Sequence, residues 1–193
     1  LRAISVYLLG EAYKPGQYTM SGLSTVTNAL FVAGGVSKEG SLRNIEIKRG
    51  NKTIAIYDFY EFLLNGSLDS DLRLQDGDII FVPFIQNQVR IGGSFRRPHN
   101  YEIIKGETIQ DAIDLAGGAS SDVLSSTKIE LTSFNTELNK REVFFIPSDS
   151  SVLKERKLMN GDTINISSSS VTEVQSFRIS GEVLRPGDYA ILP

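Results

Sequence analysis

The chain has 193 residues, of which 40% are hydrophobic and 22% are charged, and its formal net charge at pH 7 is −3. This composition is typical of a globular protein with room for one large or two small domains. The acidic balance argues against a protein that binds nucleic acid through its charge, and the absence of cysteine excludes disulfides, Cys-ligated zinc and thiol catalysis. No apolar run approaches the roughly 20 residues of a membrane helix.

The first elements are a strand, a turn and a second strand. An alternating run around Val6 and Leu8 predicts the first strand, and a short run that ends at Tyr18 predicts the second. In the turn between them, Pro15 fixes φ at the first corner, and we expect Gly16 to accept a positive φ at the next.

A short helix follows, because apolar residues recur at the helical spacing. They are Val26, Ala29, Leu30 and Ala33. Thr25 stands where an N-cap belongs, and the pair Gly34-Gly35 is expected to end the helix, since glycine takes the left-handed position after a helix without steric cost. A middle strand at Ile45 and Ile47, the turn Gly77-Asp78 and a last strand at residues 79–82 complete the unit.

The same signals return along the chain, which makes the sequence a tandem repeat. Gly10, Pro15 and Tyr18 recur 83 residues later as Gly93, Pro98 and Tyr101, and a further 88 residues later as Gly181, Pro186 and Tyr189. The helix signals recur at Thr108, Ile109, Ala112, Ile113 and Ala116, followed by Gly117-Gly118. After one inserted residue, Ile129 and Leu131 repeat the middle strand, and Gly161-Asp162 repeats the last turn.

The second copy differs from the others in its hairpin turn. His99 stands where the other copies have Gly16 and Gly187, so the turn is predicted to be type I-like or to hold His99 in a strained left-handed conformation. His99 is also the sole histidine of the chain. A solvated turn histidine is favoured over the base of a hydrolase, because no nucleophile motif accompanies it.

Two strands, a helix and further strands within some eighty residues predict a helix on one face of a mixed sheet. The fold class is therefore α+β, as two tandem β-grasp (ubiquitin-like) domains at residues 1–86 and 87–170 plus the opening hairpin of a third at 171–193. Units of this size are marginal alone, and the joint Phe84–Gln88 is short and apolar, so we expect the two domains to pack on each other. We expect the last hairpin to dock onto another surface as well.

The repeated residues are predicted to be scaffold residues of each unit. They are Gly10, Pro15, Gly16, Tyr18, Gly34, Gly35, Gly77 and Asp78 in the first copy, Gly93, Pro98, Tyr101, Gly117, Gly118, Gly161 and Asp162 in the second, and Gly181, Pro186, Gly187 and Tyr189 in the third.

This pattern of strand, glycine, Pro-Gly turn and tyrosine, then a helix ending in Ala-Gly-Gly and a final Gly-Asp turn, resembles the SLBB domain, the soluble-ligand-binding β-grasp module. Tandem copies resemble the periplasmic body of outer-membrane polysaccharide export proteins, which serve capsule and exopolysaccharide transport. The resemblance implies a structural, ring-forming component with no enzymatic activity, cofactor or metal. Its implied partners are further copies of itself, the exported polysaccharide and an inner-membrane polysaccharide copolymerase, with no nucleic acid.

The resemblance also implies a place in the periplasm, associated with the outer membrane through parts that this sequence lacks. We expect the chain to be a fragment of a longer protein, because it begins at a strand and ends inside the third copy. The calcium-loop spacing fails in the acidic stretch 69–78, where a leucine stands at the position that requires glycine.

Two alternatives stay open. The chain could be a soluble small-ligand or carbohydrate-binding module with a pocket near residues 84–89, or a docking module of a larger redox or uptake complex. Tyr57 and Tyr60 are candidate glycan contacts, although rings in a short amphipathic helix more often belong to the core.

Overall fold

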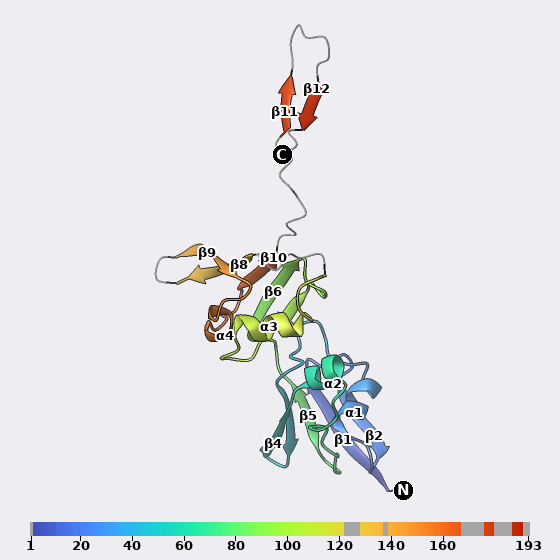
Figure 1. The fold of residues 1–193 in the computed structure, drawn as a ribbon. Helices are drawn as coiled ribbons and strands as arrows, with labels where there is room; N and C mark the ends of the chain where they lie inside the picture. The colour runs from blue at the N-terminus through green and yellow to red at the C-terminus, as the bar shows by residue number, and fades with distance from the viewer. Residues whose placement is uncertain (1, 122–127, 137–138, 167–175, 180–186, 191–193) are drawn as a thin grey trace.

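The computed structural model describes residues 2–121, 128–136, 139–166, 176–179 and 187–190. Its strands form two five-stranded sheets that follow one another along the chain, and a hairpin of β11 (Ser176–Ile179) and β12 (Gly187–Ala190) (Figure 1). The predicted α+β class is confirmed. We propose the bounds 1–86 and 87–170 for the two domains, which enclose the two sheets.

The first sheet has the strand order β2-β1-β5-β3-β4. The elements of this domain are β1 (Ala3–Gly10), β2 (Gly16–Ser21), α1 (Val26–Val32), β3 (Ile45–Arg49), β4 (Lys52–Tyr57), α2 (Phe59–Asn65) and β5 (Ile79–Val82). β1 and β5 lie side by side and parallel, with Leu8 opposite Ile80, whereas the other pairs in the sheet are antiparallel. Because parallel neighbours need a long crossover, the helices and the β3–β4 pair lie between them in sequence.

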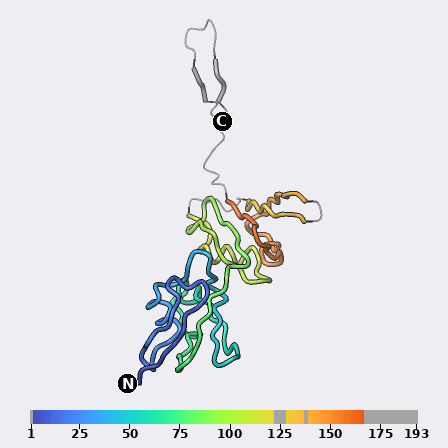
Figure 2. Tube along the Cα trace, turned by 180° about the vertical axis from the view of Figure 1, so that it is seen from behind, coloured from blue at the N-terminus to red at the C-terminus, as the bar shows by residue number. Residues whose placement is uncertain are grey.

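The second sheet repeats this topology in the order β7-β6-β10-β8-β9. Its elements are β6 (Gln88–Gly93), β7 (Asn100–Glu102), α3 (Ile109–Leu115), β8 (Lys128–Asn135), β9 (Lys140–Pro147), α4 (Val152–Glu155) and β10 (Thr163–Ile166). β6 and β10 form the parallel central pair, as β1 and β5 do. The β8–β9 hairpin extends sideways from the rest of this domain, as Figures 1 and 2 show from opposite sides.

Both predicted helices begin at the predicted threonines. Thr25 and Thr108 each accept a hydrogen bond from the backbone of the residue three positions on, and the side chain of that residue, Asn28 or Asp111, bonds back to the cap. Gly34 follows the first helix with φ 82°, where a side chain would be strained. These caps therefore fix the helix ends as the sequence predicted.

Each domain has its own buried core between its helices and its sheet. The largest fully buried side chains include Leu8, Leu30, Ile47 and Ile80 in the first domain, and Ile91, Ile109, Leu131 and Ile164 in the second. The strand residues Leu8, Ile47 and Ile80 match Ile91, Leu131 and Ile164 in the repeat, and Leu30 and Ile109 lie on the buried faces of α1 and α3, so the two copies bury the same face of the same elements.

The structure differs from the sequence prediction in strand number, and it decides between the alternatives for the hairpin turns. β4 and β9 were not predicted, and they are the outermost strands of their sheets. Gly16 has φ 159°, so the positive φ predicted for this turn position is confirmed. Asn139 is the non-glycine residue with positive φ among those described, so His99 is not left-handed. His99 therefore differs in backbone conformation from Gly16, the residue at the matching position of the first copy.

Candidate functional site at the junction of the two domains

The joint between the domains, Phe84–Gln88, is hydrogen-bonded to both of them. Ser41 N donates to Pro83 O at 2.8 Å, and Ile85 N donates to Glu39 O at 2.9 Å. Toward the other end of the joint, Ile103 N of the second domain donates to Asn87 O at 3.0 Å. Since these backbone groups are paired, the joint is not a flexible tether, and the prediction that the two domains pack on each other is confirmed.

Glu102 of β7 is the polar centre of the junction and is only 6% exposed. Its carboxylate accepts hydrogen bonds from Ser41 Oγ at 2.5 Å, from Leu42 N at 2.7 Å and from Arg43 N at 3.2 Å. All three donors belong to the loop before β3 in the first domain. One carboxylate of the second domain therefore holds a loop of the first, and its burial is compensated by these bonds.

Arg43 completes the junction with its buried guanidinium. Its Nε lies 3.0 Å from Asp58 Oδ2, and its Nη1 lies 2.7 Å from Glu107 Oε2 of the second domain. Burial acts to lower the pKa of Arg43, but the charges and hydrogen bonds of Asp58 and Glu107 outweigh it and raise the pKa above its ordinary value. The arginine is therefore a charged link between acids of both domains.

Tyr60 of α2 also reaches across the junction. Its hydroxyl accepts a hydrogen bond from Glu102 N at 3.1 Å, and the guanidinium of Arg43 lies 5.2 Å from its ring centroid. Burial raises the pKa of Tyr60 above its ordinary value. The other candidate glycan contact, Tyr57, is 1% exposed and bonds to Thr27 Oγ1 at 2.5 Å, which favours the core interpretation for that ring.

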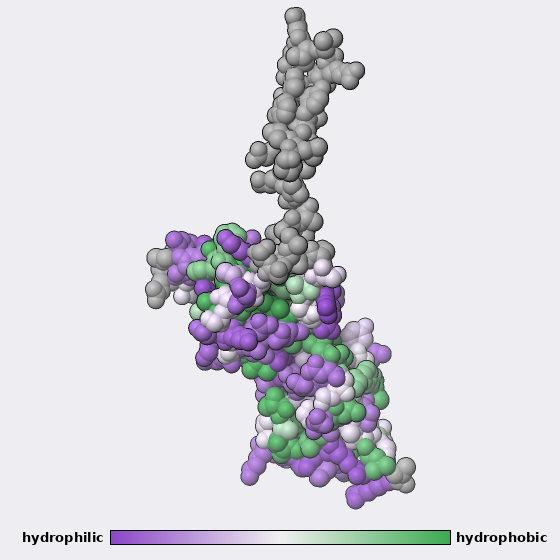
Figure 3. Space-filling model, in the orientation of Figure 1, coloured by the Kyte–Doolittle hydropathy of each residue, from purple (hydrophilic) through white to green (hydrophobic). Residues whose placement is uncertain are grey.

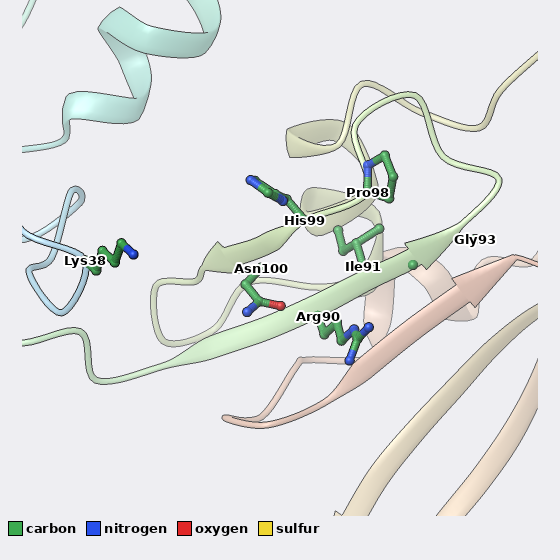
Figure 4. A pocket seen from close by; sticks show the side chains of 8 residues that line it. Lys38, Arg90, Ile91, Gly93, Pro98, His99 and Asn100 are labelled. Atoms are coloured by element: carbon green, nitrogen blue, oxygen red, sulfur yellow. The ribbon is translucent and has the colours of Figure 1, made fainter.

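Three cavities surround the junction. One of about 280 Å³ lies beside the joint, lined by Phe84, Asn87, Arg43 and Glu102 among others. The second, of about 470 Å³, lies between α2 and the turn of the β6–β7 hairpin. The third, of about 720 Å³, lies between the loop at Lys38 and the β6–β7 hairpin (Figure 4). The first of them lies at the pocket position predicted from the sequence.

The predicted scaffold residues lie apart from these cavities for the most part and act within each repeat. At Gly10, a Cβ would overlap Val82 O, and at Gly93 it would overlap Ile166 O. β1 and β5, and likewise β6 and β10, can approach this closely only because glycine has no side chain. Close backbone packing is thus the role of Gly93.

The other repeated motifs also make the same contacts in both domains. Tyr18 OH donates to Lys14 O at 2.6 Å, and Tyr101 OH donates to Arg97 O at 2.7 Å, so each tyrosine closes its own hairpin turn. Pro15 and Pro98 lie inside these turns. Burial raises the pKa of Tyr101.

The aspartates of the last turns are buried and close those turns. Asp78 accepts from Gln75 N at 2.7 Å, and Asp162 accepts from Met159 N at 2.9 Å. Arg49 forks onto Asp78 through Nε and Nη2, both at 2.8 Å, whereas Ser133 at the equivalent place donates to Asp162 at 2.6 Å. The turn glycines are Gly77 and Gly161, with φ 82° and 86°.

The remaining scaffold residues divide into two groups. Gly35 and Gly118 follow the helices with φ 92° and 82°. In the third copy, Gly187 and Tyr189 lie in β12, where Tyr189 is opposite Phe177, whereas Gly181 and Pro186 lie outside the described residues. The docking of this hairpin stays a prediction.

The junction residues were missed at the sequence level because they are not repeated. The position 83 residues before Glu102 is Thr19, and the position 88 residues after it is Ala190. A comparison of the repeats that looks for residues shared by all copies therefore does not find Glu102. The available signal was the reverse one: a carboxylate inside a strand that the other copies fill with uncharged residues.

With the fold and the junction described, similarities to known proteins give the family. A family model described as SLBB domain matches residues 5–82, and a second with the same description matches residues 88–143. The first matched segment lies within the first domain, and the second matched segment lies within the second domain. The chain therefore belongs to the SLBB domain family and carries two of these domains in tandem.

The chain is also similar to a named transport protein. Two curated relatives, both called polysialic acid transport protein KpsD of Escherichia coli, are each 28% identical over 191 residues. The match covers 98% of this chain and 32% of each relative, so the chain spans about a third of their length. The recognition made from the sequence, tandem SLBB domains related to a polysaccharide transport protein, is confirmed.

Two further observations concern metals and membranes. Within the described residues, no group of three or more His, Asp or Glu side chains could hold a metal ion. In the same part of the chain, no helix is long and apolar enough to cross a lipid bilayer.

Proposed function

We propose that this chain is the periplasmic portion of a bacterial polysaccharide export protein and a structural, ring-forming component of capsule or exopolysaccharide transport across the outer membrane. It works without catalysis, through contacts with further copies of itself, with the exported polysaccharide and with an inner-membrane polysaccharide copolymerase. The full-length protein is associated with the outer membrane.

The observation that carries this proposal is the similarity to the polysialic acid transport protein along 98% of the chain. The similarity includes both domains and the joint between them. The junction supports the same function, because Glu102 and Arg43 tie the domains into one unit. A component of a ring wall needs a defined angle between its domains.

Exposed apolar side chains on strands β8 and β9 of the second sheet support self-association. Phe134 of β8 and Val143 and Phe145 of β9 share one face of the hairpin and are exposed, Phe145 by 64%. β9 is the edge of its sheet, where backbone groups are open to a further strand. Figure 3 shows hydrophobic residues among hydrophilic ones on the visible face of the second domain. Such an apolar edge suits contact with another copy.

The test is export itself. In the source bacterium, deletion of the gene should leave polysaccharide inside the cell and remove it from the surface, and the full-length gene should restore it. Surface and intracellular polysaccharide are measured separately by sugar analysis of the two fractions. Unchanged surface polysaccharide in the deletion strain would contradict the proposed function.

A second candidate, a small-ligand binding module, is favoured by the cavity of about 280 Å³ beside the joint. It combines the apolar Phe84 and Ile103 with the charged Arg43 and Glu102, as ligand pockets do. Both charged groups are already bonded to protein partners. A panel of neutral sugars and metabolites that raises the melting temperature of the chain would support this function, since a ligand selective for the folded state stabilises it.

A further inference from the structure

The largest of the three cavities is built from both domains. Lys38 comes from the loop that follows α1, whereas Arg90, His99 and Asn100 come from the β6–β7 hairpin of the second domain. Figure 4 shows Lys38 extending toward the hairpin, His99 extending from the hairpin on the side of the first domain, and Arg90 further along β6 beyond Asn100. The cavity has a volume of about 720 Å³, which is large enough for a sugar residue.

The lining of this cavity is cationic, although the chain as a whole carries a net charge of −3. Lys38 and Arg90 are positively charged, His99 adds an imidazole N–H donor, and no carboxylate lines the cavity. The acids of the junction face Arg43 and the loop before β3 instead. An unbalanced positive lining in an acidic protein favours a negatively charged ligand.

The side chains of the lining are available to a ligand. Within the described residues, Lys38, Arg90 and His99 make no side-chain hydrogen bond or ion pair. All three are exposed. Arg90 and Asn100 are opposite each other on β6 and β7, so their side chains share one face of the sheet. Because these donors have no protein acceptor, an anion in the cavity would be their first strong partner.

An apolar cavity adjoins the cationic one. The cavity of about 470 Å³ is lined by Tyr60, Leu63 and Leu64 of α2, and it shares Pro98, His99 and Asn100 with the larger cavity. No carboxylate lines it either. The hydrogen bond from Glu102 N and the guanidinium of Arg43 hold the ring of Tyr60 in place. The side chains of α2 thus form a fixed apolar wall on the other side of the hairpin turn from the cationic cavity.

This combination distinguishes a sugar from a simple inorganic anion. Phosphate needs only donors and positive charge, whereas an acidic sugar presents a carboxylate, several hydroxyls and apolar C–H faces. The cationic lining suits the carboxylate, the Asn100 amide and His99 imidazole suit hydroxyls, and the α2 wall suits the C–H faces of an adjoining residue. Two cavities in line also match two neighbouring residues of a chain better than one small molecule.

We propose that these two cavities together form a binding site for a carboxylate-bearing segment of the polysaccharide, with the acidic group between Lys38 and Arg90. The proposal rests on the proposed function and adds to it the chemical class of the cargo, an acidic polysaccharide. The site requires both domains in their fixed arrangement, because Lys38 and α2 belong to one and the β6–β7 hairpin to the other.

The experiment is a titration of the ¹⁵N-labelled 193-residue chain, followed by NMR, with three probes: a sialic acid oligosaccharide, the same oligosaccharide with its carboxylates reduced to alcohols, and inorganic phosphate. The acidic oligosaccharide is expected to shift the amide signals of Lys38, Arg90, His99 and Asn100. The reduced oligosaccharide and phosphate should bind at least about tenfold more weakly, since each lacks one half of the recognised chemistry.

Variants that each remove one positive charge decide whether binding of the acidic oligosaccharide depends on the two cavities or on any exposed positive charge of the chain. Lys38→Gln and Arg90→Gln should each weaken binding about three- to fivefold, the range of exposed ion pairs. Their controls are Lys52→Gln on β4 and Arg141→Gln on β9, which are exposed and lie outside both cavities. Both controls should leave the affinity unchanged. Leu63→Ala, which removes apolar surface without adding charge, should weaken binding of the oligosaccharide but not of phosphate.

Several results would overturn the proposal. These are the absence of binding, equal weakening by the control variants, equal binding of the reduced oligosaccharide, or phosphate binding as tight as that of the acidic sugar. The export experiment separates a failure of the proposed function from a failure of the proposed binding site. If the deletion strain loses surface polysaccharide but the chain binds no acidic sugar, the proposed function stands and the site fails. If export survives the deletion, the proposed function fails whatever the titration shows.

Discussion

Arg43 and Glu102 bind each other reciprocally across the domain junction. The backbone N–H of Arg43 donates to the carboxylate of Glu102 at 3.2 Å, while Nη1 of Arg43 donates to the backbone carbonyl of Glu102 at 3.3 Å. Each residue thus uses its side chain to satisfy the backbone of the other. Such a pair fixes both the position and the direction of the two backbone segments, which a single salt bridge would not do.

The first prediction concerns Glu102. Glu102→Ala removes the acceptor of the Ser41 hydroxyl and of two backbone N–H groups, and should lower the free energy of unfolding by about 3 kcal/mol. Chemical denaturation measures this value. Residual dipolar couplings should show one common alignment of both domains in the parent chain and different alignments in the variant. Glu155→Ala, in the exposed part of α4, is the control and should change neither quantity.

The second prediction concerns alkaline pH. Burial raises the pKa of Tyr57, Tyr60 and Tyr101 in the folded chain, so the folded state holds these protons more tightly than the unfolded state. Their contribution to stability is fully present below about pH 10, the ordinary tyrosine pKa, and is lost as pH rises above it. Stability should therefore fall above about pH 10 by up to about 1.4 kcal/mol per pH unit for each such tyrosine.

Tyr60→Phe tests this cause. The variant should lose its hydrogen bond from Glu102 N and be less stable at neutral pH, but its stability should decline less steeply above pH 10 than that of the parent. Tyr13→Phe, at a residue that is 63% exposed, is the control. An alkaline slope of the Tyr60→Phe variant equal to that of the parent would show that burial of this phenol does not govern the decline.

The third prediction concerns the glycines at the parallel strand pairs. Gly10→Ala and Gly93→Ala place a methyl group against the carbonyls of Val82 and Ile166, so each should cost more than about 3 kcal/mol or prevent folding of its domain. Gly77→Ala is the matched control, because it has the same left-handed backbone but open space around it. It should cost only about 1–2 kcal/mol. Equal costs at Gly10 and Gly77 would show that strain, and not close packing, explains the repeat.

The fourth prediction concerns self-association. Phe145→Lys places a charge on the exposed apolar face of β9, and should lower the concentration-dependent mass of the chain in light scattering. The folded stability should hardly change, since the side chain is exposed. Removal of residues 171–193 tests the separate prediction that the last hairpin docks onto a neighbour. A parent chain that is monomeric at every concentration would leave assembly to other parts of the full protein.

The repeat explains how much of this fold the sequence could predict. Tyr18, Thr25 and Asp78 make local contacts that are the same in both copies, so their pattern alone was enough to place the hairpin, the helix and the last turn. The outer strands β4 and β9 were missed because their exposed faces carry apolar residues such as Ile56 and Phe145, which blur the usual alternation.

The junction and its cavities could not be predicted in the same way. Glu102 bonds to residues about sixty positions away in the other domain, and its partners depend on how the two copies face each other. The same holds for Lys38 and Arg90, which are isolated basic residues in the sequence and line one cavity only after both domains fold. Features that depend on the arrangement of two domains leave no periodic signal within either.

The most direct test of the account combines the junction with export. Cells whose sole copy of the full-length protein carries Glu102→Ala are compared with cells that carry Glu155→Ala, at equal protein levels established by immunoblotting. We expect the Glu102 variant to lose surface polysaccharide and accumulate it inside the cell, while the control exports normally. Normal export by the Glu102 variant, with its domains shown to be uncoupled, would contradict the claim that a fixed pair of SLBB domains serves polysaccharide export.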